Sequence, residues 1–330
     1  MAAKRKIHLI VSIDTECDKG VGWKIRYPFQ FDSVLRGIPD VLSPLFDRNH
    51  VKPTYLLSPE VIRDPACAAL LRQTRNCELG THLHGEYIEP ESDFRAEVTA
   101  MPQSAYSAEV EQAKLEKLTE LFEAEFGRRP VSFRAGRFSL SRKSLGFLDR
   151  LGYQVDSSVT PFRTNRYADG ITCNYWGAPL HPYHPSERDP RRAGALRLLE
   201  VPVTILVPAL SRWPAFILRQ LDDRILSRKR LLRCLGVKAT KIWVRPYRGT
   251  AAELTAWADT VIRRWTSTTP PIINVMFHNV EVIPGASPYA QNAGDVAGFV
   301  TSMDALFQHL NENYEVESMG LGELGKTWTN

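Results

Sequence analysis

Short apolar, β-branched runs alternate along the chain with segments whose apolar residues recur every three or four positions. The runs that predict strands are 6–13, 52–58, 77–84, 131–136, 153–158, 196–206, 241–249, 271–279 and 314–320. The amphipathic segments that predict helices are 31–49, 59–74, 107–127, 141–152, 213–236, 251–266 and 293–313. Alternation of this kind is typical of parallel strands joined by crossover helices, and therefore of the α/β class. For about eight such units, a (β/α) barrel is more economical than an open sheet.

Three of the predicted helices carry local signals for their ends or for a break. Segment 107–127 has Ser107 as a cap and Gly127 as a stop, although it lacks the Glu that would complete a capping box. Segments 31–49 and 59–74 each contain an internal proline, so we expect both to be interrupted.

Two stretches depart from this alternation. Residues 160–197 are rich in proline and aromatic residues and predict a long loop insertion, and 213–237 predicts a helical insertion. Neither resembles a linker, so we expect one catalytic domain over 1–330. The chain has no glycine-rich nucleotide fingerprint.

Composition narrows the class of protein. The 330 residues are 43% hydrophobic and 24% charged, which is ordinary for a soluble globular protein. Five scattered cysteines without a C-x-x-C pair favour free thiols in a reducing compartment. The apolar run near the N-terminus contains His8 and has no cleavage-site pattern, so it predicts a strand rather than a signal peptide. We therefore expect a cytoplasmic protein.

The net charge of +5 is modest, but basic residues cluster at 227–241 and 189–197. These clusters fit a solvated face, and they also fit contact with an anionic substrate or peripheral contact with a membrane surface. Neither cluster is interleaved with aromatic residues, which argues against nucleic acid as a partner.

Chemically capable residues recur where the predicted strands stop. They are Asp14, Glu16, His82, His84, Glu86, Arg134, Arg137, Asp156 and His278. The carboxyl ends of strands carry the active site in parallel barrels. A lone acid there also fits a turn or a helix cap, and a lone histidine also fits a hydrogen-bonded structural role. Together, however, a carboxylate and two imidazoles form a frequent catalytic set for Zn²⁺, Fe²⁺, Mn²⁺ or Co²⁺.

Five motifs occur in an order and approximate spacing that resemble a known family. They are SIDTE (12–16), GTHLH (80–84), FRAGRFS (133–139), GYQVDSS (152–158) and VMFH (275–278). Over 6–325 the chain resembles the polysaccharide deacetylase family, the NodB-homology domain of carbohydrate esterases, and its H-x-H form is similar to the WalW-like subgroup. The resemblance implies a distorted (β/α) barrel of about seven parallel strands. It also implies a hydrolase that removes N- or O-acetyl groups from sugars with a bound divalent metal.

The resemblance also implies residue roles. Asp14 would be the general base, oriented by Arg134, and His278, supported by Asp156, would be the general acid. Glu16 and His82 would bind the metal, most often Zn²⁺ with Co²⁺, Mn²⁺, Fe²⁺ or Ni²⁺ as alternatives. The third ligand would be His84 or Glu86. We prefer His84, because imidazole suits Zn²⁺ and one strand can present both rings.

Substrate contacts are expected from the proline-rich loop 176–190. Trp176 and Tyr183 are candidates to stack on a sugar, and His184 and Arg137 are candidates for polar contacts. Without an export signal, the expected substrate is an N-acetylated sugar or a lipid-linked or nucleotide-linked glycan precursor. Hydrolysis of another amide or of a formyl group remains an alternative. Glu86 and Gly136 depart from the family pattern, and they keep a third alternative open, a non-catalytic glycan-binding barrel.

Overall fold

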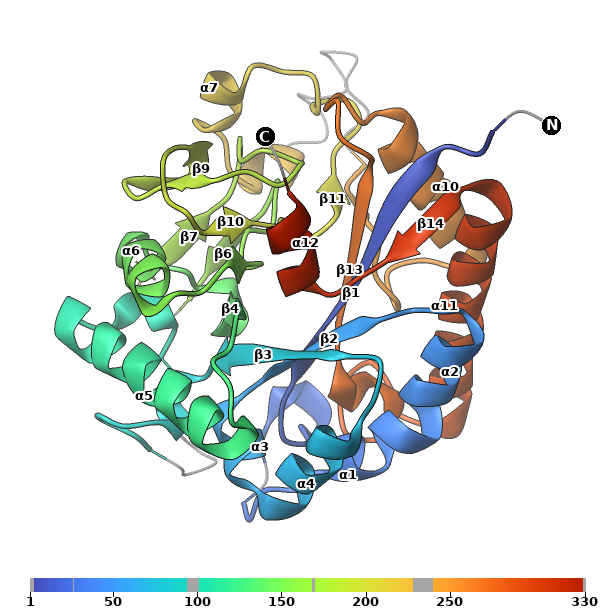
Figure 1. Ribbon diagram of the computed structural model, residues 1–330. Coiled ribbons are helices and arrows are strands. Elements are labelled where there is room, and N and C mark those ends of the chain that lie inside the picture. Colours follow the sequence, from blue (N-terminus) through green and yellow to red (C-terminus); the bar gives the residue numbers. More distant parts are fainter. Residues whose placement is uncertain (1–2, 26, 94–100, 168–169, 228–239, 329–330) are drawn as a thin grey trace.

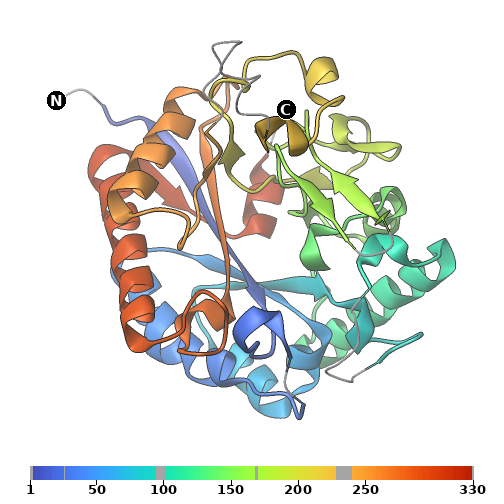
Figure 2. The same cartoon turned by 180° about the vertical axis from the view of Figure 1, so that it is seen from behind.

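The fold is described from a computed structural model that covers residues 3–25, 27–93, 101–167, 170–227 and 240–328 (Figures 1 and 2). A central parallel sheet curves into a half-barrel, and helices surround its outer side. In the described part of the chain, seven parallel strands follow the order β10, β5, β4, β3, β2, β1, β13. The predicted (β/α) barrel of about seven parallel strands is confirmed.

The strands of this sheet begin and end close to where the sequence predicted. Their bounds are β1 Lys6–Thr15, β2 Pro53–Leu57, β3 Glu78–Leu83, β4 Ser132–Ala135, β5 Val155–Asp156, β10 Leu199–Glu200 and β13 Ile272–His278. An eighth strand, β14 (Glu315–Ser318), pairs in parallel with the start of β1. All residues of β2, β3 and β4 are buried, because helices cover one side of the sheet and the barrel interior the other.

Helices occur in all seven segments that were predicted to be helical, and one further helix, α12, was not predicted. They are α1 Asp32–Leu35, α2 Ser43–Arg48, α3 Pro59–Arg63, α4 Pro65–Gln73, α5 Ala108–Phe126, α6 Arg142–Leu151, α7 Ala215–Leu218, α8 Arg224–Ser227, α10 Ala251–Arg263, α11 Ala293–Asn313 and α12 Leu321–Thr327. Ser107 caps α5 by accepting a hydrogen bond from the Val110 amide, and Gly127 ends α5 with a φ of 66°.

Prolines interrupt the predicted helix 31–49. Its centre, Gly37–Leu42, is a stretch of π-helix between α1 and α2, and it contains Pro39. Proline has no N–H to donate to the preceding turn, which is why the regular α pattern is lost there. The predicted proline break in 59–74 is likewise found between α3 and α4.

The proline-rich segment 160–197 folds into two small antiparallel pairs. These are β6 (Thr164–Arg166) with β7 (Thr172–Asn174), and β8 (Pro185–Ser186) with β9 (Asp189–Ala193). A third antiparallel pair joins β11 (Ile205–Leu206) to β12 (Ile242–Trp243). The β11–β12 pair is antiparallel, whereas parallel strands were expected at 196–206 and 241–249. In the predicted helical insertion at 213–237, residues 213–227 contain two short helices, α7 and α8, rather than one continuous helix, and 228–237 lie outside the described residues.

Asn274 of β13 bridges the two edges of the half-barrel. Its side-chain amide donates to Ser157 Oγ at 3.0 Å, to the Val201 carbonyl at 3.2 Å and to the Pro202 carbonyl at 3.3 Å. Its side-chain oxygen accepts from Ser12 Oγ at 2.8 Å. Polar side chains thus join β1 and β13 to the segment after β10 across the open side of the sheet.

No helix among the described residues combines the length and apolar character that crossing a membrane requires.

Because the Asn274 side chain joins the two edges of the half-barrel, Asn274→Ala should destabilise the barrel. The substitution removes these hydrogen bonds and leaves buried partners unsatisfied, so we expect the free energy of unfolding to fall by about 2–4 kcal/mol. Urea denaturation measures this change. Asn313→Ala, at the exposed end of α11, is the matched control and should stay within about 0.5 kcal/mol of the parent protein. An equally small effect at Asn274 would contradict the bridging role.

Candidate metal centre and active site

Strand register brings the predicted site residues together at the carboxyl ends of neighbouring strands. Asp14 of β1 lies opposite His278 of β13, and His82 of β3 lies opposite Arg134 of β4. Because the strands are parallel, their carboxyl ends lie at the same rim of the barrel. Residues at or just after these ends therefore converge there.

Glu16, His82 and His84 form a compact group of metal-ligating side chains. All three are buried, and one ligand atom from each lies within 4.8 Å of the other two. Both histidine Nε2 atoms converge on Glu16 Oε1, at 3.0 Å from His82 and 2.9 Å from His84. The structure thus groups His84, rather than Glu86, with Glu16 and His82.

Hydrogen bonds to the Nδ1 atoms fix the orientation of the two imidazole rings. His82 Nδ1 lies 3.0 Å from the Arg134 carbonyl oxygen, and His84 Nδ1 lies 3.1 Å from Glu86 Oε1. A neutral imidazole that donates from Nδ1 carries its lone pair on Nε2, as in metal-bound histidines oriented by a carbonyl or carboxylate. Two lone pairs aimed at one carboxylate oxygen fit a cation between them, so the residues suit a divalent metal.

Other polar groups hold Glu16 in place. Its second carboxylate oxygen is 2.6 Å from Lys19 Nζ, and its backbone N–H donates to Asn279 Oδ1 at 2.8 Å. Burial raises the pKa of Glu16, but Lys19 and the two histidines outweigh it and hold that pKa well below its usual range. Without metal, burial lowers the pKa of His84, yet Glu16 and Glu86 raise it to about 9.

Asp14 is held by the fully buried Arg134. Arg134 Nη1 donates to Asp14 Oδ1 at 2.6 Å, and the remaining guanidinium donors reach Ser12 Oγ, Ser157 Oγ and the Ser157 carbonyl. Burial raises the pKa of Asp14, but Arg134, followed by His82 and His278, lowers it below its usual range. The carboxyl is therefore kept ionised, as a general base requires.

His278 faces Asp14 on one side and Glu281 on the other. Its Nε2 lies 3.7 Å from Asp14 Oδ2, and its Nδ1 lies 2.8 Å from Glu281 Oε1. Arg245 pairs with the same Glu281 oxygen. The carboxylate beside His278 is thus that of Glu281, three residues further along the chain, and not that of Asp156 as the sequence reasoning proposed.

Asp156 instead pairs with Glu200 on the adjacent strand β10. The two residues are register partners, Ser158 Oγ donates to Asp156 Oδ1 at 2.5 Å, and the Val159 N–H donates to Glu200 Oε1 at 3.0 Å. Burial raises the pKa of both carboxyls, and the charge of Asp156 raises that of Glu200 further. Both carboxyls are therefore harder to ionise than free ones, and they lie on paired strands of the barrel rather than beside His278.

A cavity of about 420 Å³ opens onto the metal group. It is lined by Glu16, Lys19, Trp23, Ile25, His84, Arg137, Phe138, Arg163, Trp243, Arg245, Arg248, His278 and Tyr289. The predicted contact residue Arg137 is among them. Trp23 packs on His278 with ring centroids 4.9 Å apart, and Tyr289 packs on Trp23 at 5.7 Å. These two aromatic residues come from loops that follow β1 and β13.

The other predicted substrate residues lie elsewhere. Trp176 is 0% exposed and donates from Nε1 to Asp223 Oδ1 at 3.1 Å. Tyr183 is buried and donates to the Pro190 carbonyl, and His184 Nδ1 lies 3.1 Å from the Leu198 carbonyl oxygen. The structure does not bring these three side chains to the cavity, because the proline-rich segment packs against the barrel as hairpins.

Sequence reasoning also missed Lys19, Glu281, Asn279 and Trp23. One signal was available for Glu281, since the run HNVE places a carboxylate three residues after His278, within reach across one turn. Trp23 lies in a segment without periodicity, and nothing in the sequence pattern indicated where that segment folds.

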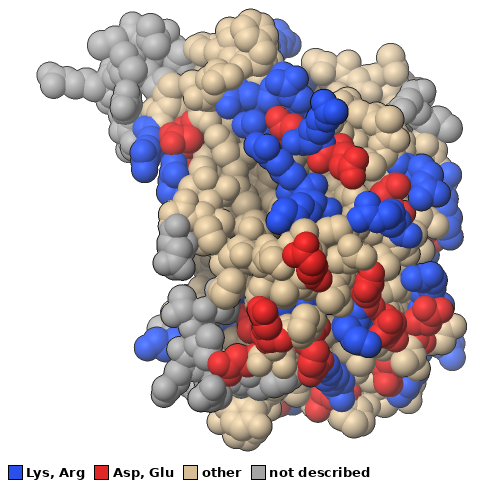
Figure 3. Space-filling model, turned by 90° about the vertical axis from the view of Figure 1, so that its left-hand side faces the viewer, with Lys and Arg blue, Asp and Glu red and all other residues tan. Residues whose placement is uncertain are grey.

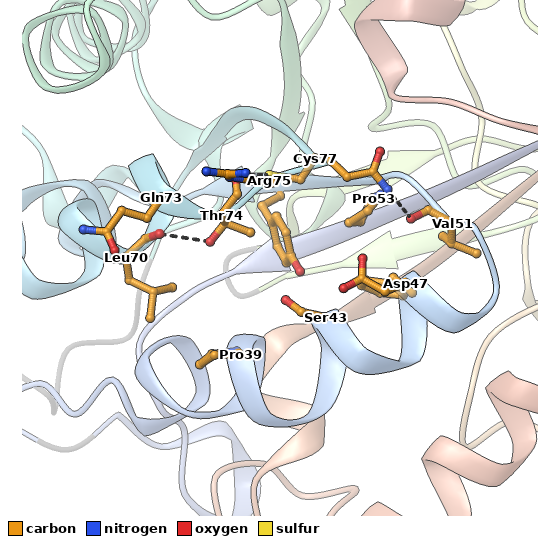
Figure 4. A pocket seen from close by; sticks show the side chains of 13 residues that line it. Pro39, Ser43, Asp47, Val51, Pro53, Leu70, Gln73, Thr74, Arg75 and Cys77 are labelled. Atoms are coloured by element: carbon orange, nitrogen blue, oxygen red, sulfur yellow. Dashed lines mark hydrogen bonds between the residues drawn. The ribbon is translucent and has the colours of Figure 1, made fainter.

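A second cavity, of about 360 Å³, lies at the amino ends of β2 and β3 (Figure 4). Its lining includes Ser43 and Asp47 of α2, Thr74 and Cys77. Thr74 Oγ1 already donates to the Leu70 carbonyl. This end of a parallel barrel usually serves stability rather than catalysis, so the first cavity is the candidate active site.

Basic residues also gather on the outer surface. Figure 3 shows Lys and Arg concentrated in the upper half of one face, with Asp and Glu more frequent below. The hairpin β8–β9 and helix α7 lie at the upper left of Figure 1 and therefore on this face. The predicted cluster 189–197 belongs to this hairpin and the residues after it, whereas 228–239 of the other cluster lie outside the described residues.

No family model and no curated protein match the sequence. Solved structures do resemble the fold. A structure named as a polysaccharide deacetylase from Mycobacterium smegmatis has a TM-score of 0.49 at 12% identity, covering 99% of this chain and 91% of that one. Puue allantoinase has a TM-score of 0.50 at 12% identity, covering 98% and 90%. The 4-alpha-glucanotransferase from Thermococcus litoralis has a TM-score of 0.54 at 13% identity, covering 99% of this chain and 41% of that one. The likeness to the last two shows a shared fold.

Glu200→Gln should change how stability depends on pH. The raised pKa of Glu200 means that the folded state holds a proton that the unfolded state releases above the usual carboxyl range, so the native pair loses stability as pH rises. The variant lacks that titration. As pH rises above the ordinary carboxyl pKa, we expect the free energy of unfolding of the variant to increase relative to that of the parent protein by up to about 1.4 kcal/mol per pH unit.

Urea denaturation at several pH values between about 5 and 8 tests this prediction, since the window starts above the ordinary carboxyl pKa. The exposed Glu187→Gln serves as the control and should keep the slope of the parent protein. A parallel slope for Glu200→Gln and the parent would show that the pair holds no extra proton.

Proposed function

We propose that the chain is a metal-dependent hydrolase that removes an N-acetyl or O-acetyl group from a sugar or glycan precursor. The observation that carries this proposal is the convergence of both histidine Nε2 atoms on Glu16 Oε1 beside the paired Asp14 and Arg134. We assign the chain to the polysaccharide deacetylase family, in its WalW-like form, on the five ordered motifs. The expectation of a cytoplasmic role in glycan biosynthesis belongs to the same proposal.

Glu16, His82 and His84 would hold the metal, for which Zn²⁺ is the first candidate from the donor set. A bound divalent cation would supply Lewis-acid activation of water and of the acyl carbonyl. Glu86 would support the ligand His84 without binding the metal itself. Its Oε1 accepts a hydrogen bond from His84 Nδ1 and pairs with Arg137 Nη2 at 2.7 Å. This arrangement keeps His84 oriented with its lone pair toward the metal site.

Asp14 and His278 divide the proton transfers. Arg134 occupies Asp14 Oδ1, so Oδ2 is the atom that faces the site and accepts the proton of the attacking water. His278 donates from Nε2 to the leaving nitrogen or oxygen, while Nδ1 stays hydrogen-bonded to Glu281. An amine leaves poorly unless it is protonated, so His278 matters most for N-acetyl substrates.

His82→Ala and His84→Ala should each abolish metal binding. We expect the metal content of the purified protein to fall from about one ion per chain to a trace, because two donors hold Zn²⁺ far less tightly than three. Elemental analysis measures the content. His50→Asn, which changes an exposed histidine, is the control and should keep the metal. Full metal content in both active-site variants would overturn the assignment.

Asp14→Asn should keep the metal and lose the reaction. Loss of a general base lowers kcat by roughly 10²–10⁴-fold, and the amide retains the shape of the carboxylate. The measurement is acetate release from N-acetylglucosamine oligomers, alongside elemental analysis of the same sample. Unchanged turnover would refute the role of Asp14. Formate release from N-formylated sugars by the parent protein, without acetate release, would favour the formyl alternative.

A further inference from the structure

Three arginines surround Trp243 on the wall of the candidate active-site cavity. The guanidinium carbons of Arg163, Arg248 and Arg245 lie 4.7, 5.0 and 5.2 Å from the centre of the Trp243 ring. All four side chains line the cavity that also contains Glu16, His84 and His278. We call these three arginines and Trp243 the arginine platform.

Two guanidiniums of the arginine platform lack a counter-charge within the described residues. Arg245 is paired with the buried Glu281. Among the residues that the structure describes, no carboxylate lies within 4.0 Å of Arg163 or Arg248. Lys19 and Arg137, which line the same cavity, are already neutralised by Glu16 and Glu86. The cavity therefore has two positive charges, those of Arg163 and Arg248, for which the described residues offer no paired carboxylate.

Asp223 is the acid that most influences Arg163, but it is engaged elsewhere. Its Oδ1 accepts from Lys241 Nζ at 3.0 Å and from Trp176 Nε1, and its Oδ2 accepts from the Thr164 backbone N–H at 3.2 Å. Burial lowers the pKa of Arg163, and the nearby charges of Arg248 and Arg245 lower it further. Three like charges around one ring repel each other, and stacking on the indole offsets only part of that cost.

We propose that the arginine platform binds a phosphate or diphosphate group carried by the substrate, a specificity that rests on the proposed deacetylase function. A phosphate monoester or a sugar-linked diphosphate carries a charge near −2, which matches the two unpaired guanidiniums. Arginine presents several N–H donors in a planar fork that suits phosphate oxygens. The anion replaces the missing counter-charge and removes the repulsion within the arginine platform.

The cavity has room for both ends of such a substrate. At about 420 Å³ it lies in the range of small-molecule sites. Glu16, His84 and the arginine platform line one continuous space, in which Trp23 packs on His278 and Tyr289 packs on Trp23. A sugar ring against these aromatic faces can hold its acyl group near His278 and its phosphate near Arg248. The substrate class is therefore an acylated sugar phosphate, whether its diphosphate leads to a nucleotide or to a prenyl lipid.

Kinetics of acetate release test the proposal. The substrates are N-acetylglucosamine, its 1-phosphate, UDP-N-acetylglucosamine and a prenyl-diphosphate-linked N-acetylglucosamine, each at low and high salt. We expect kcat/KM for at least one phosphorylated substrate to exceed that for the neutral sugar by more than about tenfold at low salt. The better of the two diphosphates identifies the nucleotide or the lipid as its source. Equal rates on neutral and phosphorylated sugars would overturn the proposal.

Arg248→Gln and Arg163→Gln should each lower that preference about tenfold, mainly through KM. Arg248 is exposed, so its substitution should leave the fold intact. Arg188→Gln, in the turn between β8 and β9 and away from the cavity lining, is the matched control and should keep the full preference. Unaltered preference in both platform variants would contradict the assignment.

A binding measurement separates failure of this proposal from failure of the proposed function. Inorganic pyrophosphate is titrated calorimetrically into the metal-loaded parent, Arg248→Gln and Arg188→Gln proteins, with equal metal content verified. If no substrate releases acetate but pyrophosphate binds the parent and binds Arg248→Gln about tenfold more weakly, the arginine platform stands and the deacetylase function fails. If acetate is released and pyrophosphate binds all three proteins alike, the arginine platform fails alone.

Discussion

The buried ion pair between Arg134 and Asp14 is the interaction on which both the barrel and its site depend. Arg134 is 0% exposed, and a charge so buried is tolerated only when it is paired and its donors are satisfied. Asp14 supplies the opposite charge, while Ser12 and Ser157 accept the other guanidinium hydrogen bonds. Since Ser12 and Ser157 also bond to Asn274, the contacts that join the barrel edges and those that hold Asp14 form one network.

This sharing of contacts has a physical consequence for any change at the base. Removing one partner of a buried pair usually costs about 3–5 kcal/mol, because the remaining charge is left uncompensated. A change at Asp14 therefore alters the stability of the barrel as well as the charge at the candidate site. His278 is less constrained, because its partner Glu281 belongs to the same turn.

Sequence reasoning predicted the elements of the barrel and the residues at its strand ends, because both follow from periodicity and from parallel register. Glu16, His82 and His84 converge since consecutive parallel strands end at one rim. What it did not predict depended on where loops fold. Asp156 faces Glu200 rather than His278 because β5 pairs with β10, and Trp176 and Tyr183 are buried since their segment forms hairpins. No local pattern encodes such long-range packing.

Charge pairing around the cavity explains how one site can suit both a metal and an anion. Glu16 is matched by Lys19, Asp14 by Arg134, Glu86 by Arg137 and Glu281 by Arg245. Each of these carboxylates is thus neutralised by its own basic partner, so they do not create a negative field that would repel an anion in the cavity. Among the described residues, the positive charge left without a paired carboxylate at the cavity wall is that of Arg163 and Arg248, and it favours an anion there.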